Sequence, residues 1–216
     1  MMFCDYNNGN LIGLKSNGAF DLAYFERESS IAVTQWLRVQ KLFHIIDPNS
    51  RTIKRTIKSS DTPYGIALNK TVLVYCKSGK GIMEVQLNGE SEKALVSFSM
   101  PHFSYVAVHG DNIFYTNENS NSVTCFDILG NLKWKFKDTQ ILKNPQGISV
   151  DNNGNVYVVS RDINSVVIIT PDGKRCKTIL SSRDSLKSPR AMHFEPTSNK
   201  LLVANENKIA FLFDVS

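Results

Sequence analysis

The sequence has no long apolar run and no recognisable leader. Its longest apolar stretches, such as Ala210 to Phe213 and Val156 to Val159, fall far short of the roughly 20 residues that a membrane-spanning helix needs. The start of the chain, Met1 to Tyr6, carries neither a basic cluster nor an apolar segment of signal-peptide length. We therefore expect a soluble cytoplasmic protein with no membrane partner.

Residues that bind metals or carry out catalysis are also scarce and scattered. The cysteines contain no C-x-x-C pair, which argues against a zinc site and against a disulfide framework: Cys4, Cys76, Cys125 and Cys176. The histidines have no partner at metal or triad spacing: His44, His102, His109 and His193. No G-x-S-x-G, Walker or Rossmann phrase occurs. We expect no enzyme activity, no cofactor and no metal.

Two local features have simple structural interpretations. His44 lies in an apolar run, where a histidine paired with a neighbouring polar group is the expected state. The segment 151–155 begins like a calcium loop, but its glycine is misplaced and no acidic residue stands at the twelfth position. Its Asp, Asn and Gly residues predict a tight hairpin instead.

What the sequence does contain is a repeat of short β-rich runs separated by polar turns. The second strand of each repeat is predicted to open at Ser30, Thr71, Asn112, Asn155 and Lys200, and the spacings are 41, 41, 43 and 45 residues. Helical periodicity is missing, so helices should be nearly absent. A period in this range indicates an all-β propeller with four antiparallel strands in each blade.

The clearest repeat runs from Asn144 to Leu180. It predicts four strands, at 147–150, 155–160, 166–169 and 177–180, with turns rich in Asp, Asn and Gly between them. The inner strand lies closest to the propeller axis, so Gly147 should leave little room for a larger side chain.

This repeat resembles the NHL repeat. The matching positions are Pro145, Gly147, Ile148, Val150, Asp151, Gly154, Val156, Tyr157, Val158, Asn164, Val166, Val167, Ile168 and Gly173. The opening phrase returns at Pro63-Tyr64-Gly65-Ile66 and, with alanine for glycine, at Pro189-Arg190-Ala191-Met192. The resemblance covers essentially the whole chain, is sharp from about Asn144 onward, and implies a six-bladed propeller.

By this resemblance, the chain is one propeller domain over 1–216 with incomplete terminal blades, about five blades' worth in all. Full blades are expected at about 19–60, 61–99, 100–142 and 143–186, with partial blades at 1–18 and 187–216. The chain would then begin inside a blade, as a fragment of a longer protein does.

The net charge of +5 is expected to come from two groups of basic residues. Lys133, Lys135 and Lys137 alternate with apolar residues, and Arg51, Lys54, Arg55 and Lys58 form a similar run; both fit outer strands protected against edge-to-edge pairing. The other group falls in turns that should meet on one face of the propeller. We predict that it forms the partner site: Trp36, Arg38, Lys41, Tyr64, Lys77, Lys80, Lys143, Arg161, Lys187, Arg190 and Lys208.

The resemblance implies a non-catalytic module that recognises a protein partner on this loop face, like the C-terminal propellers of tripartite-motif ubiquitin ligases. Two alternatives stay open: RNA binding through the same basic face, and a propeller hydrolase or lyase, for which no ligand set is visible. If the loop-face prediction is right, Arg161→Glu with Arg190→Glu should abolish binding and leave the fold intact, because both residues are expected in exposed loops.

Overall fold

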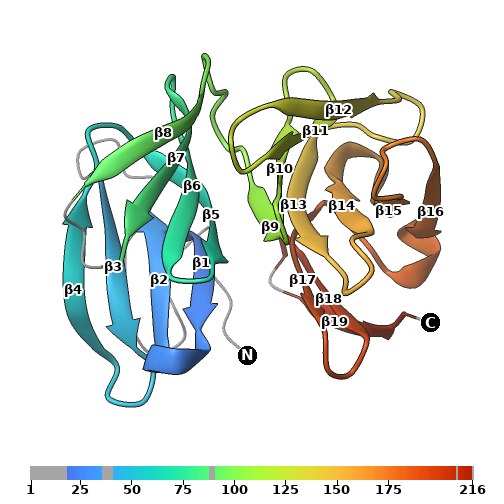
Figure 1. The fold of residues 1–216 in the computed structure, drawn as a ribbon. Helices are drawn as coiled ribbons and strands as arrows, with labels where there is room; N and C mark the ends of the chain where they lie inside the picture. Colours follow the sequence, from blue (N-terminus) through green and yellow to red (C-terminus); the bar gives the residue numbers. More distant parts are fainter. Residues whose placement is uncertain (1–18, 36–40, 88–90, 208, 216) are drawn as a thin grey trace. The chain divides into compact units, whose positions relative to one another are not determined.

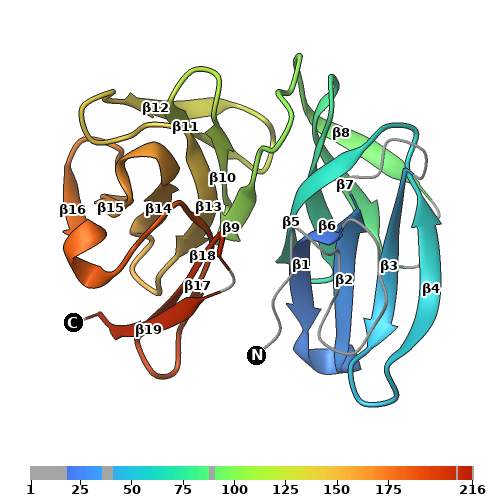
Figure 2. The ribbon, with the colours of Figure 1, turned by 180° about the vertical axis from the view of Figure 1, so that it is seen from behind.

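The computed structural model describes residues 19–35, 41–87, 91–207 and 209–215. These residues form five antiparallel sheets, and within each sheet the strands pair in chain order (Figures 1 and 2). The chain divides into two compact units, Met1–His102 and Phe103–Ser216. Each unit is described by itself.

The N-terminal unit holds two four-stranded sheets. The first contains β1 (Ala19–Phe25), β2 (Ser30–Gln35), β3 (Leu42–Asp47) and β4 (Thr52–Lys58), with the 3-10 turn η1 (Glu26–Glu28) between β1 and β2. The second contains β5 (Pro63–Asn69), β6 (Val72–Lys77), β7 (Gly81–Gln86) and β8 (Glu92–Ser97). The inner strands β1 and β5 pack beside each other, and a shared core that includes Phe43, Leu73 and Tyr75 joins the two sheets.

The C-terminal unit holds three sheets. The first contains β9 (Val106–His109), β10 (Asn112–Asn117), β11 (Ser122–Asp127) and β12 (Leu132–Lys137). The second contains β13 (Pro145–Val150), β14 (Val156–Ser160), β15 (Ser165–Ile169) and β16 (Cys176–Leu180), with η2 (Arg161–Ile163) before β15. After η3 (Ser182–Asp184), the third contains β17 (Pro189–Glu195), β18 (Lys200–Asn205) and β19 (Ala210–Asp214).

The sequence prediction of an all-β propeller with four-stranded antiparallel blades is confirmed. The described residues form five sheets, which is compatible with the expected five blades' worth of chain, whereas the six blades that the resemblance implies are not seen. The predicted partial blade at 1–18 lies outside the described residues. Each predicted second strand begins within one residue of the observed one, and the helices of the described part are the three short 3-10 turns. The single-domain boundary stays a prediction.

Two further local predictions can be compared with the structure. His44 Nδ1 lies 2.9 Å from Thr56 Oγ1, as expected for a paired histidine. In the 151–155 turn, Asp151 Oδ1 accepts hydrogen bonds from the backbone N–H of Asn153 and of Asn155, both at 2.9 Å. Gly154 has φ +82°, which the tight turn between β13 and β14 requires. The segment is therefore a hairpin, and the Asp151 carboxylate stabilises its turn by accepting backbone hydrogen bonds.

Four of the five described inner strands carry an irregularity at the Pro-x-Gly phrase or at the corresponding position. Their pairing with the second strand shifts register at Ala19/Leu22, Pro63/Ile66, Pro145/Ile148 and Pro189/Ala191. Such bulges bend a strand and increase its twist. At Gly147 the bulge brings the backbone against β17, where an added Cβ would lie 2.8 Å from Arg190 O and 2.9 Å from Met192 N. The glycine therefore sets the packing distance between β13 and β17.

In β1 the position of this glycine is occupied by Asp21. Its Oδ2 accepts a hydrogen bond of 2.9 Å from the Ile66 N–H of the neighbouring inner strand, and its Oδ1 accepts one of 2.9 Å from Leu22 N–H. The Asp21 carboxylate thus connects β1 to β5. In the C-terminal unit, by contrast, the backbones of β13 and β17 are in direct contact at the corresponding position. Desolvation by burial raises the pKa of Asp21 to about 7, although these two hydrogen bonds act to lower it.

We predict that Asp21→Asn removes a component of the pH dependence of stability. The folded protein holds a proton on Asp21 up to about pH 7, whereas the unfolded chain releases it near pH 4. The wild type should therefore lose stability relative to the variant as the pH rises from about 4 to about 7, with no further change above. Urea unfolding of both proteins at pH 5 and pH 8 measures this difference. Equal pH dependence in the two proteins would contradict the raised pKa.

Candidate partner-binding face

In the C-terminal unit, the turns between second and third strands lie beside the segments that lead into the inner strands. Hydrogen bonds connect them from one blade to the next: Asn144 N–H donates to Asn121 Oδ1 at 2.8 Å, and Ser188 N–H donates to Asn164 Oδ1 at 2.7 Å. Asn121 and Asn164 have positive φ, a conformation that asparagine tolerates. The repeated asparagine therefore fixes the position of each turn against the next blade. We call this set of segments, residues 118–121, 138–144, 161–164, 181–188 and 206–209 without residue 208, the loop face.

A polar network crosses the loop face. It starts at Gln146, the residue between proline and glycine on β13, whose Nε2 donates to Glu118 Oε2 at 3.0 Å and to Asn144 Oδ1 at 2.6 Å. Asn144 Nδ2 donates in turn to Asp162 Oδ1 at 3.1 Å. Gln146 is only 1% exposed. The network therefore extends from a buried residue on an inner strand to residues of the surrounding turns.

The same network continues into the last blade through a shared carboxylate. Arg161 donates to Asp162 Oδ1 at 3.4 Å and to Glu206 Oε2 at 2.8 Å, and Arg190 donates to Glu206 Oε1 at 3.0 Å. The side chains of Arg161 and Arg190 are 27% and 14% exposed. The hydrogen bond from Arg161, followed by the charges of both arginines, holds the pKa of Glu206 below its usual value. At neutral pH this carboxylate is ionised and ties the two cations in place.

Buried polar atoms of this network without a hydrogen-bond partner in the described part of the chain include Gln146 Oε1, an acceptor, and Arg161 Nε, a donor. Buried polar groups are nearly always paired with protein or with ordered water. The network therefore has capacity for one further donor and one further acceptor.

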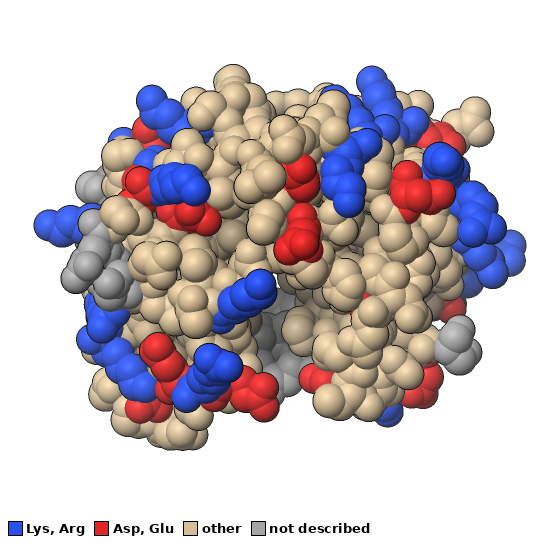
Figure 3. All heavy atoms as spheres, in the orientation of Figure 1, with Lys and Arg blue, Asp and Glu red and all other residues tan. Residues whose placement is uncertain are grey.

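Over its described residues the loop face carries as many basic as acidic side chains, whereas the sequence predicted a basic face. Its basic side chains, counted with Arg190 on β17, are Lys143, Arg161, Arg183, Lys187 and Arg190, and its acidic side chains are Glu118, Asp138, Asp162, Asp184 and Glu206. Basic residues outnumber acidic ones instead on the outer strands and the hairpin before β16, at Lys133, Lys135, Lys137, Lys174, Arg175 and Lys177 against Asp127 and Asp172. Blue spheres over β12 and along β16 in Figure 3 follow this distribution.

The predicted site residues of the C-terminal unit are partly brought together. Lys143 and Lys187 are exposed on the loop face. Arg161 and Arg190 lie in one network, but Arg190 belongs to strand β17 and both side chains are largely covered. The expectation that both arginines sit in exposed loops is therefore wrong. Trp36, Arg38 and Lys208 fall outside the described residues.

In the N-terminal unit the predicted residues have different environments. Lys41 forms an ion pair with Asp61 at 2.9 Å and stays 42% exposed, and Lys80 is exposed. Tyr64 is buried, and its hydroxyl lies 2.9 Å from His102 Nδ1. Lys77 is 3% exposed and pairs with Glu92 at 2.5 Å. Tyr64 and Lys77 thus support the fold from inside rather than offer a contact surface.

Sequence reasoning missed the residues that organise the loop face, namely Gln146 and Asn144 together with the pairing of Glu206. A usable signal exists in the repeat itself: the residue after proline in the Pro-x-Gly phrase is Tyr64, Gln146 or Arg190, and each contacts the turn region of its own unit. It also missed that His102 Nδ1 lies 3.2 Å from Ser78 Oγ. The hydroxyl of Tyr64 contacts the same His102 Nδ1 atom.

The described residues contain no group of three or more His, Cys, Asp or Glu side chains placed to hold a metal ion. Within that same part of the chain no helix is long and apolar enough to cross a membrane.

Comparison with known proteins gives a local sequence match and a broad fold match. No family model matches the chain. An 80-residue stretch is 31% identical to the E3 ubiquitin-protein ligase TRIM56 of Mus musculus, which covers 37% of this chain and 11% of the mouse protein. The match thus spans about a tenth of the relative's length. Together with the blades, it supports the resemblance to the propellers of tripartite-motif proteins.

Solved structures share the fold at low identity. A virginiamycin B lyase from Staphylococcus aureus aligns with a TM-score of 0.64 and 12% identity over 92% of this chain and 70% of its own. A chain of a nidogen/laminin complex aligns with a TM-score of 0.68 and 14% identity over 91% of this chain and 80% of its own. A protein of unknown function from Bacteroides thetaiotaomicron VPI-5482 aligns with a TM-score of 0.72 and 14% identity over 90% of this chain and 58% of its own. These neighbours include an enzyme and a binding protein, so they establish the propeller and leave the activity open.

Proposed function

We propose that the chain is a non-catalytic binding module whose C-terminal unit presents the loop face to a protein partner. The observation that carries this proposal is the charge balance of the face, with Arg161 and Arg190 both paired to Glu206. A surface that recognises phosphates gains affinity from cations available to neutralise them. Here the two best-placed cations already share a carboxylate, and the alternating charges suit a polar protein surface with complementary groups.

The unpaired atoms of the network support the same proposal. A partner segment that enters beside Gln146 and Arg161 and offers both a donor and an acceptor, as any peptide group does, would complete the network. Such an arrangement favours a peptide over a phosphate backbone, whose phosphate oxygens supply acceptors alone.

The match to the mouse ubiquitin ligase supports a more specific role. In this role the module selects substrates within a ubiquitin ligase system, and the chemistry of ubiquitin transfer belongs to other parts of that system. A cytoplasmic location remains part of this proposal.

The test is a photo-crosslinking amino acid at the exposed position Lys187, used in lysate treated with RNase. We expect a crosslinked protein partner. Its binding should fall about tenfold, the cost of about 1.4 kcal/mol, for Arg161→Ala with Lys143→Ala. Alanine is used rather than glutamate because a carboxylate next to Glu206 would disturb the fold by like-charge repulsion.

The matched control is Lys135→Ala with Lys137→Ala on β12, which removes the same charge from an outer strand. Binding of the partner should change less than about twofold in this control. Equal losses in the two variants, or a crosslink that disappears on RNase treatment, would contradict the proposal.

A further inference from the structure

Two carboxylates of the loop face fix the orientation of the buried Gln146 amide. At one end of the network Glu118 Oε2 accepts from Gln146 Nε2, which also donates to Asn144 Oδ1. At the other end Asp162 Oδ1 accepts from Asn144 Nδ2. Ionised carboxylates accept hydrogen bonds and donate none, so turning over either amide would place its oxygen against a carboxylate oxygen. Gln146 Oε1 is therefore a buried acceptor, and it has no hydrogen-bond partner in the described part of the chain.

Glu118 differs from the other acidic side chains of the loop face. Glu206 and Asp162 pair with arginines. Asp138 and Asp184 accept backbone N–H groups in their own turns. Glu118 is half-buried, accepts its hydrogen bond from a neutral side-chain amide, and makes no ion pair with any described residue. A partly covered carboxylate is stabilised by a nearby cation.

The two acceptors lie next to each other. Gln146 Oε1 belongs to the same amide group as Nε2, and Nε2 lies 3.0 Å from the Glu118 carboxylate. A ligand group that satisfies both acceptors has a positive charge and several N–H donors. The guanidinium of arginine has five such donors in one plane and no acceptor, and it pairs readily with carboxylates. A backbone amide has a single N–H donor and no charge.

We propose that the partner of the loop face inserts an arginine side chain beside Gln146. Its guanidinium pairs with Glu118 and donates a hydrogen bond to Gln146 Oε1, and a backbone carbonyl of the same segment accepts from Arg161 Nε. This inference rests on the proposed function, because it specifies the chemistry of the protein segment that the loop face recognises.

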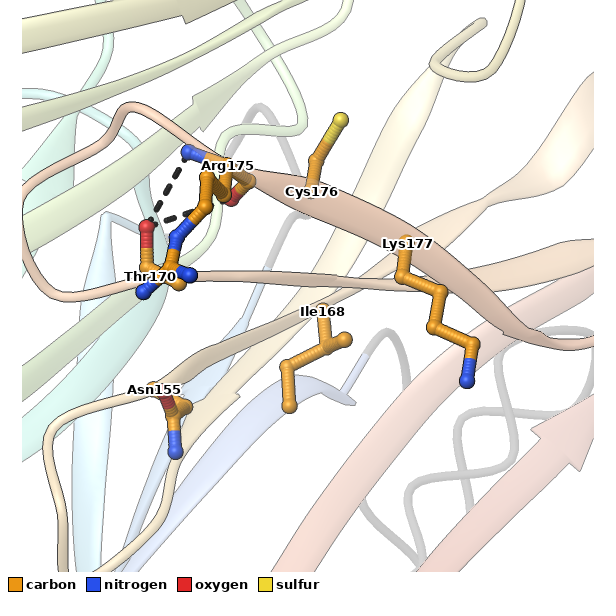
Figure 4. Close-up of a pocket in the computed structure, with 6 residues that line it drawn as sticks. All are labelled: Asn155, Ile168, Thr170, Arg175, Cys176 and Lys177. Carbon is orange, nitrogen blue, oxygen red and sulfur yellow. Dashed lines mark hydrogen bonds between the residues drawn. The ribbon is translucent and has the colours of Figure 1, made fainter.

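A hollow on another part of the same unit has the opposite charge. It measures about 280 Å³ and is lined by Asn155, Ile168, Thr170, Arg175, Cys176 and Lys177 (Figure 4). Thr170 Oγ1 accepts from Arg175 N–H at 3.1 Å and so closes the hairpin before β16. The charged side chains that line the hollow are both cations and both exposed. An arginine of a partner is therefore repelled there and attracted to Glu118.

The test uses acetylated and amidated tripeptides with arginine, citrulline or lysine between two glycines. Citrulline has nearly the shape of arginine but no charge. Titration followed by the NMR signals of the Gln146 and Asn144 side-chain amides gives the affinities. The arginine peptide should shift these signals and bind at least about tenfold more tightly than the citrulline peptide, and about threefold or more tightly than the lysine peptide, which lacks the planar donors.

A variant then identifies the carboxylate. Glu118→Gln should weaken the arginine peptide by about tenfold or more. Its side-chain oxygen can still accept from Gln146 Nε2, so the variant should keep its fold. The matched control is Asp172→Asn in the hairpin of Figure 4, which removes the same charge and should weaken the peptide by less than about threefold.

Three results would each overturn the inference: equal binding of the citrulline peptide, equal losses in the two variants, or an arginine peptide that leaves the Gln146 signals unchanged. The last result would mean that the chain itself already covers these acceptors. Failure of the proposed function has a different sign, since it appears as the lack of an RNase-resistant crosslink from position 187. A partner that crosslinks there but binds equally well to Glu118→Gln would overturn the inference alone.

Discussion

Replacing Glu92 with alanine is expected to lower the free energy of unfolding of the N-terminal unit by about 3 kcal/mol. Lys77 is 3% exposed and its Nζ lies 2.5 Å from Glu92 Oε2. The hydroxyl of Tyr75 donates to the other carboxylate oxygen. Although desolvation acts to raise it, these hydrogen bonds keep the pKa of Glu92 below its usual value. Without the carboxylate, an ammonium group would be left buried and unpaired, and urea unfolding measures the cost.

The matched control for this prediction lies on the same pair of strands. Glu84 on β7 pairs with Lys93 on β8 at 3.2 Å, but the lysine is 73% exposed, so Glu84→Ala should cost less than about 1 kcal/mol. A second variant, Lys77→Met with Glu92→Leu, removes both charges and should recover most of the loss. If Glu92→Ala costs no more than Glu84→Ala, Lys77 is not buried as described.

Gly147→Val is the second change with a large expected effect, a loss of about 3 kcal/mol in the C-terminal unit. The three nearest atoms to an added Cβ, Arg190 O, Met192 N and Ala191 Cα, are all backbone atoms at 2.8 to 3.0 Å. Backbone cannot rotate aside as a side chain does, so β13 and β17 must separate. Thermal unfolding followed by circular dichroism at the β-sheet band measures the loss.

Ala94→Val on the exposed part of β8 serves as its control, because it adds the same branched side chain where there is space. That variant should keep the unfolding temperature of the wild type to within about 2 °C. Equal unfolding temperatures for Gly147→Val and the wild type would show that β13 and β17 are not in close backbone contact.

Much of the fold follows from local sequence. The turns of Asp, Asn and Gly locate the hairpins, and the alternation of Lys133 to Lys137 with Trp134 and Phe136 places an outer strand correctly at β12. The number of sheets was less predictable, because it depends on which segments pair at the ends of the chain. Pairing of that kind is a long-range property that a repeat period does not contain.

The site was harder to predict because its interactions join distant residues. Arg161 and Glu206 are 45 positions apart, and Arg190 and Glu206 are 16 apart, so no short motif reveals that one carboxylate holds both arginines. Lys77 and Tyr64 were assigned to the surface because they stand near turns. In the structure each points inward from a strand end, towards Glu92 and His102. A count of cations therefore overestimated the positive charge available for binding.

The most direct test of the charge-balanced loop face is the salt dependence of partner binding. The dissociation constant of the partner recovered through position 187 should change by less than about tenfold between 50 and 200 mM salt, because few counterions are released from a face whose described basic and acidic side chains are equal in number. A fall in affinity of about a thousandfold or more over the same range is the signature of several neutralised phosphates, and it would contradict recognition of a protein on this face.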